Sequence, residues 1–140
     1  MRNNEKLVAY FNKTAGKRDK WKRRNKLYHK TLNKYYSFII PEKSKVLEIG
    51  SGTGDLLNAV KPGFGVGIDF ACNMVEIAQK KYPHLNFYCS DAEEFKLNEK
   101  FDYIILSDLL SSSLDIQKVL SNLRHVIHKR TKLIISNYNY

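Results

Sequence analysis

The pattern of hydrophobic and polar positions changes near Pro41. Before this residue, large apolar side chains recur at spacings of three, four and seven, which is typical of one stripe on a helix. The stripe consists of Trp21, Tyr28, Leu32, Tyr35, Tyr36 and Ile39, while Lys20, Arg23, Lys30 and Lys34 fall elsewhere on the helical wheel. The pattern predicts a basic amphipathic helix within an N-terminal helical arm, residues 1–40.

After Pro41, short apolar runs alternate with helical segments. The expected strands are KVLEI, VGIDF, NFYCS, FDYIILS and TKLIIS, and the expected helices are DLLNAV, CNMVEIAQKKY and DIQKVLSNLRHVIHK. This alternation is typical of parallel strands joined by right-handed crossovers, with helices on both faces of the sheet. We expect residues 41–140 to form an α/β domain, a doubly wound and mostly parallel sheet. Ligands bind such sheets at the carboxyl ends of the strands.

The last expected helix carries signals at both ends. Asp115 stands where an N-cap belongs. Four cationic or titratable residues at the other end, His125, His128, Lys129 and Arg130, suit the negative end of the helix dipole. We therefore expect the two histidines to lie at the surface of this helix end and expect no metal site.

Composition narrows the class of protein. A chain of 140 residues, 43% of them hydrophobic, is long enough for one cored domain. It has no stretch near the roughly 20 uninterrupted apolar residues of a membrane helix, so we expect a cytoplasmic protein without a transmembrane segment. Cys72 and Cys89 have neither metal-type nor framework-type spacing, and we expect them to be small buried side chains in a reducing compartment.

The net charge of +10 is unevenly distributed. Residues 1–45 contain 14 Lys and Arg against 3 Asp and Glu, whereas residues 46–140 contain 10 against 11. This asymmetry favours an anionic partner such as nucleic acid, acidic lipid headgroups or a phosphorylated substrate, and does not choose among them.

A glycine turn follows the first expected strand. In VLEIGSGTGDLL, residues 46–57, Gly50, Gly52 and Gly54 alternate before a helix, so a ligand can lie against bare backbone beside the helix N-terminus. Asp55 stands where a dinucleotide fingerprint needs glycine, and the Gly-Lys-Ser/Thr of a P-loop is absent. Glu48, just before the turn, repels a pyrophosphate and attracts an ammonium or sulfonium group.

Two further acids follow the next two expected strands. Asp69 ends the second strand, where a carboxylate can accept hydrogen bonds from ribose hydroxyls. Asp91 and Ala92 follow the third strand, where a carboxylate can accept from an exocyclic amine such as that of adenine. Acids at three consecutive strand ends indicate a nucleoside site.

These motifs, with the order of strands and helices, resemble the class I S-adenosylmethionine-dependent methyltransferases over roughly residues 8–140. The most specific segments are VLEIGSGTGDLL, VGIDFACNMVEIA, SDAEEF and FDYIILSDLL. The resemblance implies S-adenosylmethionine as the cofactor. By this resemblance the methionine and ribose portion is lined by Glu48, Gly50, Ser51, Gly52 and Gly54, with Ser107 near the methionine ammonium. Asp69 is expected to bind the ribose hydroxyls. Adenine is expected to pack against Phe70 and Met74, with its polar edge at Asp91 and Ala92.

The chain departs from that family at both ends. The segment YFNKTAGKRDKW resembles one often found before such domains, but Arg18 stands where relatives often have tyrosine. The family's sheet has seven strands, and the sequence ends at Tyr140 just after the fifth, so the C-terminal strand hairpin is expected to be missing. We expect a missing C-terminal region, a dimer contact or a partner domain, such as a glycosyltransferase-like one, to cover the fifth strand.

The expected reaction is an in-line methyl transfer, which depends on alignment and needs no protein nucleophile, so no catalytic residue is assigned. Arg18, Asn25, Tyr28, His29 and Asp108 are candidates for the acceptor side of the pocket, with Asp108 and His29 as candidate bases. We expect a small-molecule, sugar or lipid-linked acceptor in preference to nucleic acid. Two alternatives stay open: a module that binds S-adenosylmethionine without independent activity, and a basic nucleic-acid-binding protein or RNA methyltransferase.

Overall fold

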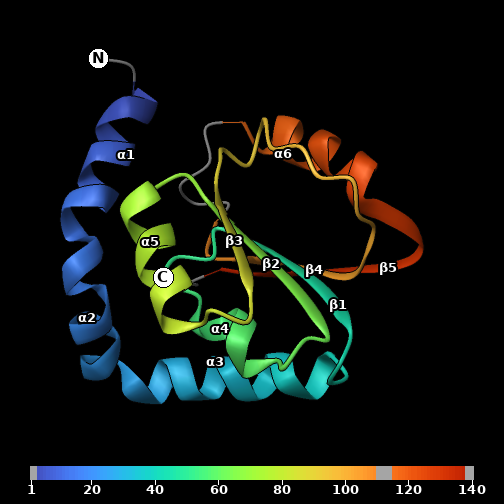
Figure 1. The fold of residues 1–140 in the computed structure, drawn as a ribbon, viewed down its shortest axis with the longest axis horizontal. Coiled ribbons are helices and arrows are strands. Elements are labelled where there is room, and N and C mark those ends of the chain that lie inside the picture. Colours follow the sequence, from blue (N-terminus) through green and yellow to red (C-terminus); the bar gives the residue numbers. More distant parts are fainter. Residues whose placement is uncertain (1–2, 110–114, 138–140) are drawn as a thin grey trace.

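Five parallel strands form the centre of the molecule in a computed structural model that describes residues 3–109 and 115–137 (Figure 1). The elements in chain order are α1 (Asn3–Thr14), η1 (Ala15–Lys17), α2 (Arg18–Arg24), α3 (Lys26–Ile39), β1 (Lys45–Ile49), α4 (Asp55–Ala59), β2 (Phe64–Asp69), α5 (Cys72–Lys81), β3 (Asn86–Cys89), β4 (Phe101–Ser107), α6 (Ile116–Asn122), η2 (Leu123–Val126) and β5 (Ile127–Ser136). The α/β fold expected from the sequence is confirmed.

The strand order of the sheet is β3-β2-β1-β4-β5, and every neighbouring pair is parallel. The chain builds outward from β1 to β3 on one side and from β4 to β5 on the other. The order therefore reverses between β1 and β4, which is the point where doubly wound sheets bind ligands.

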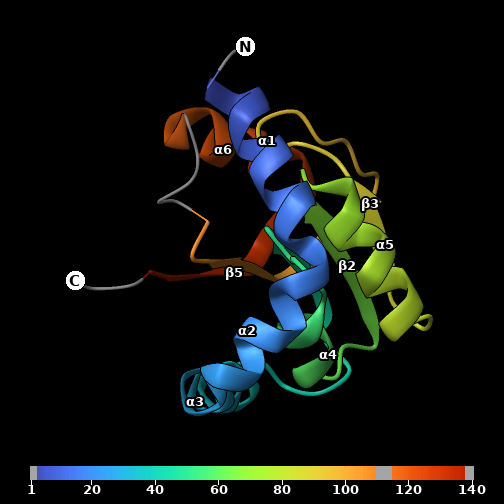
Figure 2. The same cartoon turned by 90° about the vertical axis from the view of Figure 1, so that its left-hand side faces the viewer.

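Helices cover both faces of the sheet (Figures 1 and 2). Side chains alternate along β1, so Leu47 packs with Val119 of α6 on one face, while Val46 packs with Leu57 of α4 on the other. Glu48 shares the second face with Val46. Burial on both faces explains why the strands read as continuous apolar runs.

The N-terminal arm forms three successive helices, which corrects the single helix expected through Trp21 and Ile39. Helix α2 ends at Arg24, and α3 begins at Lys26. Between them Asn25 leaves the helical conformation, and its Nδ2 donates to the Trp21 carbonyl oxygen at 3.0 Å. An asparagine side chain that bonds to nearby backbone competes with the helix, which accounts for the break.

The helices of the arm pack against the sheet domain at different places. Helix α1 packs against α5, and α3 packs against α4 (Figure 1). Of the expected apolar stripe, Tyr36 is buried, whereas Trp21 is 41% exposed and Tyr35 is 65% exposed. The stripe therefore covers the sheet domain only in part.

The C-terminal helical segment is shorter than expected. Asp115 is the N-cap of α6, and its Oδ1 accepts from the Lys118 backbone N–H at 2.9 Å, as expected. The chain leaves the helix at Asn122 and enters β5 at Ile127, so His128 lies in a strand and not at a helix end. Pairing of Ile127 with Phe101 of β4 begins the strand early and overrides the helical pattern.

Neither histidine of this region belongs to a metal cluster. His125 Nδ1 lies 2.5 Å from the Asn122 carbonyl oxygen, and His128 Nε2 lies 3.0 Å from Asp102 Oδ1. Within residues 3–109 and 115–137, no group of three or more His, Cys, Asp or Glu side chains could hold a metal ion.

The two cysteines correct another expectation. Cys72 at the start of α5 and Cys89 at the end of β3 are exposed and form a disulfide, with 5.0 Å between their Cα atoms. The crossover through α5 brings the end of β3 beside the end of β2, so residues 17 apart in the sequence become neighbours. The expectation of buried, reduced thiols is therefore wrong in this structure, and the expected cytoplasmic location stays a prediction.

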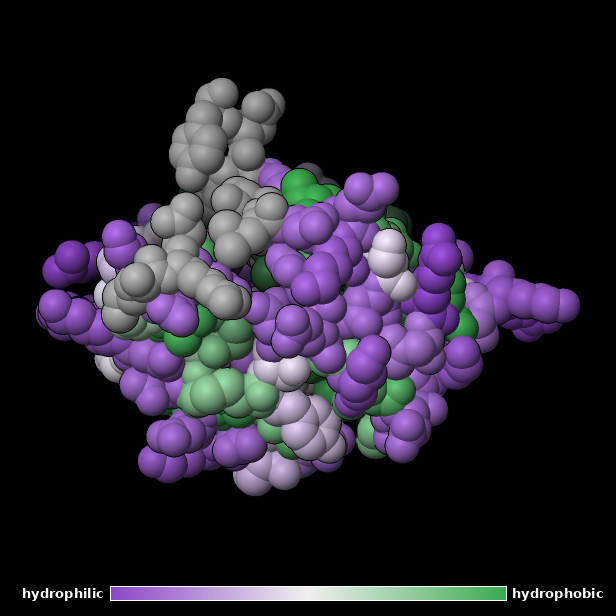
Figure 3. Space-filling model, turned by 90° about the horizontal axis from the view of Figure 1, so that it is seen from above, coloured by the Kyte–Doolittle hydropathy of each residue, from purple (hydrophilic) through white to green (hydrophobic). Residues whose placement is uncertain are grey.

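Hydrophilic side chains cover most of the surface seen from above, and hydrophobic ones form separate small areas (Figure 3). None of the helices in the described segments has both the length and the apolar character needed to cross a bilayer.

Candidate active site

A cavity of about 930 Å³ lies at the carboxyl ends of β1 and β4, between the sheet and helices α2 and α3. The strand ends and the glycine turn contribute Glu48, Gly50, Ser51, Gly52, Ser107 and Asp108 to its lining. The two helices contribute Arg18, Asp19, Lys22, Arg23, Lys26, His29, Lys30, Leu32 and Asn33. Pockets that hold small molecules commonly enclose about 300–1,000 Å³. The position is the one that the strand order predicts for a ligand.

The glycine turn at the end of β1 combines two different requirements. All three of its glycines have positive φ, and at Gly54 (+86°) a Cβ atom would lie 2.6 Å from Cζ of Phe87. At Gly52 (+52°) a Cβ atom would meet nothing within 4 Å. Gly54 is therefore needed for packing, whereas Gly52 leaves its backbone open to the cavity.

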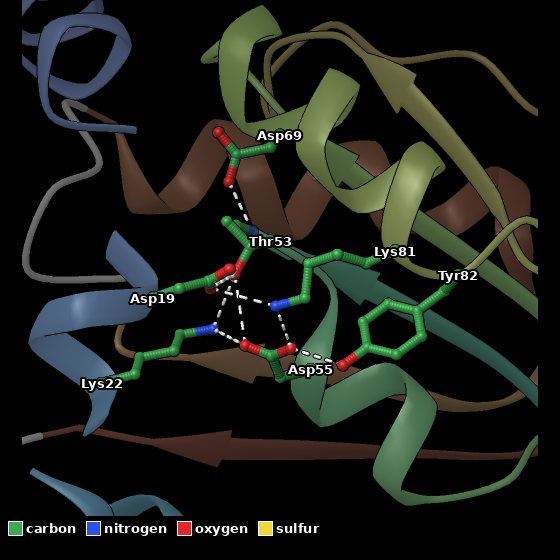
Figure 4. A network of polar contacts seen from close by, with 8 residues as sticks. Asp19, Lys22, Thr53, Asp55, Asp69, Lys81 and Tyr82 are labelled. Carbon is green, nitrogen blue, oxygen red and sulfur yellow. Dashed lines mark hydrogen bonds and ion pairs between the residues drawn. The ribbon is translucent and has the colours of Figure 1, made fainter. Parts of the chain in front are cut away.

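Asp69 holds this turn from the neighbouring strand. Its Oδ2 accepts from the Gly52 N–H at 2.8 Å (Figure 4). Its Oδ1 accepts from the Ala71 N–H, also at 2.8 Å. Burial raises the pKa of the Asp69 carboxyl, while these two backbone donors oppose the rise. The carboxylate therefore fixes the turn at the ends of both β1 and β2.

Two polar groups at the start of the glycine turn are buried without a partner among the described residues, Oε2 of Glu48 and Oγ of Ser51, as is Nε2 of His29 on the helical wall of the same cavity. Glu48 is only 3% exposed, and its burial raises the carboxyl pKa to about 8, against the lowering effect of the Lys22 charge. An unpaired buried polar atom costs roughly 1–3 kcal/mol, and native proteins contain few of them. The two atoms at the turn are therefore placed to contact a bound ligand.

The residues present fit the positively charged cofactor that the sequence motifs imply. An acidic side chain, an unpaired hydroxyl and the open backbone of Gly52 lie together in one cavity. This donor and acceptor set suits an amino-acid ammonium and a sulfonium better than a pyrophosphate.

An ionic network closes one side of the cavity (Figure 4). Asp55, at the start of α4, accepts from Lys22 of α2 at 2.5 Å, from Lys81 of α5 at 2.6 Å and from the Tyr82 hydroxyl at 2.6 Å. Burial would raise the pKa of Asp55, but the Lys22 charge and these hydrogen bonds hold it well below its usual range. The network joins α2 to α4 and α5.

Two more residues extend this network from α2 to the glycine turn. Asp19 pairs with Lys81 at 3.0 Å and accepts from the Thr53 hydroxyl at 3.2 Å. Thr53 is fully buried and also accepts from Lys22 at 3.0 Å. The Asp19-x-Trp21 segment of the arm is thereby fixed to the turn that follows β1.

Helix α3 places two candidate acceptor-side residues in contact with each other. The Tyr28 hydroxyl donates to Asp108 Oδ2 at 3.1 Å. The His29 ring contacts the Tyr28 and Trp21 rings edge-on, with centroids 5.1 and 5.5 Å apart. Burial, with the charges of Lys22 and Arg18, lowers the pKa of His29, so its imidazole is neutral near pH 7.

The residues expected to bind the cofactor fall into two groups. Glu48, Gly50, Ser51, Gly52 and Ser107 line the cavity, whereas Gly54, Asp69, Phe70, Met74, Asp91 and Ala92 do not. Most of the second group lies at or just after the ends of β2 and β3, while Met74 lies in α5 and Gly54 lies beneath Phe87. The structure thus brings together the residues expected for the methionine portion and keeps those expected for adenine apart from this cavity.

The N-terminal arm contacts part of the second group. Asn4 Nδ2 donates to Asp91 Oδ2 at 3.0 Å, and the Phe11 ring contacts the Phe70 ring edge-on at 5.5 Å. Met74 is buried in a cluster that includes Ala15. The N-terminal arm therefore covers the adenine side as well as forming the cavity wall.

The acceptor-side candidates are also divided. Arg18, His29 and Asp108 line the cavity. Asn25 and Tyr28 are not among its lining residues: Asn25 stands at the break between α2 and α3, and Tyr28 contacts two lining residues, Asp108 and His29.

Sequence reasoning missed the ionic network around Asp55. In the sequence, Asp55 was used only to exclude a dinucleotide fingerprint. Lys22 and Lys81 could not be recognised as its partners because they lie 33 and 26 residues away from it along the chain.

Comparison with known proteins agrees with the fold. A family model described as a methyltransferase domain matches residues 40–140. Malonyl-[acyl-carrier protein] O-methyltransferase of Bacillus anthracis is 32% identical over 114 residues, which cover 77% of this chain and 42% of that protein. The ubiquinone/menaquinone biosynthesis C-methyltransferase UbiE of Campylobacter jejuni is 25% identical over an alignment of 160 positions, covering 99% of this chain and 66% of that protein.

A solved structure is similar in fold. The N-methyltransferase NodS of Bradyrhizobium japonicum, in complex with S-adenosyl-L-homocysteine, has a TM-score of 0.66 at 19% identity, covering 75% of this chain and 58% of that chain. The chain thus spans between about two fifths and two thirds of the length of these relatives. Since the family model extends over all five strands and the whole glycine turn, the chain belongs to the methyltransferase-domain family, the class I S-adenosylmethionine-dependent methyltransferases.

Proposed function

We propose that this chain binds S-adenosylmethionine in the cavity at the ends of β1 and β4 and transfers its methyl group to a small-molecule, sugar or lipid-linked acceptor. The observation that carries the proposal is the pair of unpartnered buried atoms, Glu48 Oε2 and Ser51 Oγ, beside the open backbone of Gly52. The sulfonium of the bound cofactor supplies an already activated methyl group.

In this proposal Glu48, Gly50, Ser51, Gly52 and Ser107 hold the methionine portion, and Gly54 and Asp69 shape the turn around the ribose. Phe70, Met74, Asp91 and Ala92 receive adenine. Because Asn4 occupies one oxygen of Asp91 and Phe11 lies against Phe70, adenine binding at these residues requires displacement of those two α1 side chains. Residues 1–40 then act as an arm that covers the binding domain, residues 41–140.

The acceptor side faces α3. A hydroxyl or amine acceptor loses a proton as the methyl group is transferred. His29 suits this task because its imidazole is neutral and its Nε2 is buried with no hydrogen-bond partner among the described residues. Asp108, which accepts from Tyr28, is the second candidate for this role.

Two relatives indicate the kind of acceptor. Their names refer to malonyl-[acyl-carrier protein] and to ubiquinone or menaquinone biosynthesis, so one acts on a carrier-linked small molecule and the other belongs to quinone formation. This supports an acceptor that enters a cavity, in preference to an extended nucleic acid.

The test is calorimetric titration of the chain with S-adenosylhomocysteine, followed by transfer of a labelled methyl group to panels of sugars, lipids, quinones and RNA. We expect binding that weakens at least tenfold in Glu48→Ala, while Glu42→Ala, an exposed glutamate outside the cavity, leaves it unchanged. Absence of binding to the wild-type chain would overturn the proposal. Binding without transfer to any panel would favour the alternative, a binding module without independent activity.

A further inference from the structure

Cationic side chains gather on the helical wall of the cavity. Five of them, Arg18, Lys22, Arg23, Lys26 and Lys30, come from α2 and α3, and Lys81 comes from α5. The strand ends on the opposite side contribute the acids Glu48 and Asp108. The cavity therefore has an acidic floor and a basic wall.

Three of these six cations have neither an ion-pair partner nor an aromatic ring beneath them among the described residues. Lys22 and Lys81 are paired with Asp55, and Arg18 stacks over the Trp21 ring at 4.5 Å. The remaining three are Arg23, Lys26 and Lys30, and none of them forms an ion pair in the part of the chain that the structure describes.

The spacing of these three residues concentrates their charge. Lys26 and Lys30 stand four residues apart on α3, and neighbouring like charges at this spacing destabilise a helix. Arg23 precedes them by one turn across the break at Asn25. An arrangement that is unfavourable in the free protein becomes favourable when an anion binds between the side chains.

The neighbouring histidine adds no charge to this wall. Burial, followed by the charges of Lys22 and Arg18, lowers the pKa of His29, which lies on the same helix between Lys26 and Lys30. The charge of Asp55 opposes this shift, and the Tyr28 ring also contacts His29. Because His29 is neutral, the unpaired positive charge of the wall comes from Arg23, Lys26 and Lys30.

We propose that the methyl acceptor carries a phosphate group, which Arg23, Lys26 and Lys30 bind at the wall of the cavity. This inference rests on the proposed function, since it names the class of acceptor for the same site. A phosphate monoester carries nearly two negative charges near pH 7 and has three acceptor oxygens. Three cationic side chains therefore suit a phosphate group of the acceptor better than a carboxylate group. Leu32 and Leu56 line the same cavity and suit an apolar part of that acceptor.

The experiment compares two triple variants with equal loss of charge on the same two helices. Arg23→Gln/Lys26→Gln/Lys30→Gln removes the wall cations, and Arg24→Gln/Lys20→Gln/Lys34→Gln removes one arginine and two lysines that do not line the cavity. The probe is inorganic pyrophosphate, titrated calorimetrically into the full chain at low salt. Melting temperatures report whether both variants are folded.

We expect the wall variant to bind pyrophosphate at least tenfold more weakly than the wild type, and the control variant to change by less than twofold. Equal weakening in both variants, or no binding to the wild type, would overturn the inference. Titration of the wild type with S-adenosylhomocysteine tests the proposed function separately: that binding can persist while the phosphate inference fails.

Further probes identify the source of the phosphate. One probe is co-sedimentation with phosphatidylcholine vesicles that contain phosphatidic acid. If the wild type and the control variant sediment with the vesicles and the wall variant does not, the phosphate belongs to a lipid headgroup. Pyrophosphate binding without vesicle binding would assign a soluble phosphorylated acceptor. Another probe is a single-stranded RNA. If the wild type binds that RNA, both variants bind it equally more weakly and pyrophosphate does not displace it, the inference is overturned in favour of nucleic acid.

Discussion

Glu48 carries a proton near neutral pH because it is buried without a cation against its free oxygen. Lys22 lowers the pKa of this carboxyl, but its ammonium is already bound to Asp55 and Thr53. The effect of burial therefore dominates, and the pKa is about 8 against an ordinary value of 4.5. A positive ligand would shift this proton equilibrium towards the carboxylate.

The raised pKa of Glu48 predicts that stability falls as pH rises. The folded chain binds this proton more tightly than the unfolded chain, so the contribution is complete below about pH 4.5 and is lost progressively up to about pH 8. Each unit of pKa difference corresponds to about 1.4 kcal/mol. Urea denaturation between pH 5 and pH 8 should show the wild type losing stability relative to Glu48→Gln. An identical pH profile in the two proteins would contradict the assignment.

The two glycines with different surroundings give separable effects. Gly52→Ala should cost about 1–2 kcal/mol for a left-handed alanine but leave the fold intact, and its methyl group would enter the cavity and weaken S-adenosylhomocysteine binding. Gly54→Ala should cost more, because its methyl group meets Phe87 as well. Chemical denaturation and calorimetry of both variants test this. If the two variants had the same free energy of unfolding and the same loss of S-adenosylhomocysteine binding, the different roles of Gly52 and Gly54 would be contradicted.

At the scale of elements, the arm is attached through both polar and apolar contacts. Helix α2 is joined to α4 and α5 through Asp55, and α1 contacts the residues that follow β2 and β3 through Phe11 and Asn4. Ala15 of η1 packs against α5, and Tyr36 of α3 lies in the core beside the sheet. The cavity wall therefore depends on the position of α2, which its ion pairs determine.

Asp55→Asn should destabilise the chain by about 2 kcal/mol, between the values typical of exposed and buried ion pairs, because Lys22 and Lys81 lose a partly buried partner. Glu42→Gln is the matched control, since its pair with Lys61 is exposed on both sides and should change stability by less than about 0.5 kcal/mol. Denaturant midpoints measure both. Similar small losses in the two variants would show that the network contributes little.

The disulfide joins the start of α5 to the end of β3. Closing a loop of this length typically stabilises a protein by about 3 kcal/mol. Cys72→Ser/Cys89→Ser should therefore lower the free energy of unfolding by about that amount, and dithiothreitol should lower that of the wild type equally. Dithiothreitol should leave the double variant unaffected. A wild type insensitive to the reductant would contradict a stabilising disulfide.

At the scale of the whole molecule, β5 forms one edge of the sheet. It pairs with β4, and its Leu133 and Ile135 are 41% and 45% exposed. Exposed apolar edge strands favour association with another strand or domain. A C-terminal region, a second copy or a glycosyltransferase-like partner covering this edge stays a prediction.

Much of the fold was predictable because its signals are local. Each buried parallel strand reads as an apolar run, and the glycine turn with Glu48 stands in one continuous segment. The early start of β5 at Ile127 and the Cys72–Cys89 bond depend on contacts between distant segments. The same holds for Lys22 and Lys81, whose role arises only when three helices pack together. The break at Asn25 depends on a local hydrogen bond from its side chain to the Trp21 carbonyl, which the apolar spacing of the arm does not reveal.

The hydrogen bonds from Gly52 and Ala71 to Asp69 have a kinetic consequence. They hold the turn in its curved shape before any ligand arrives, so little backbone entropy is lost when a nucleoside docks there. Association should then be limited by diffusion and by the opening of α1, and not by ordering of the loop.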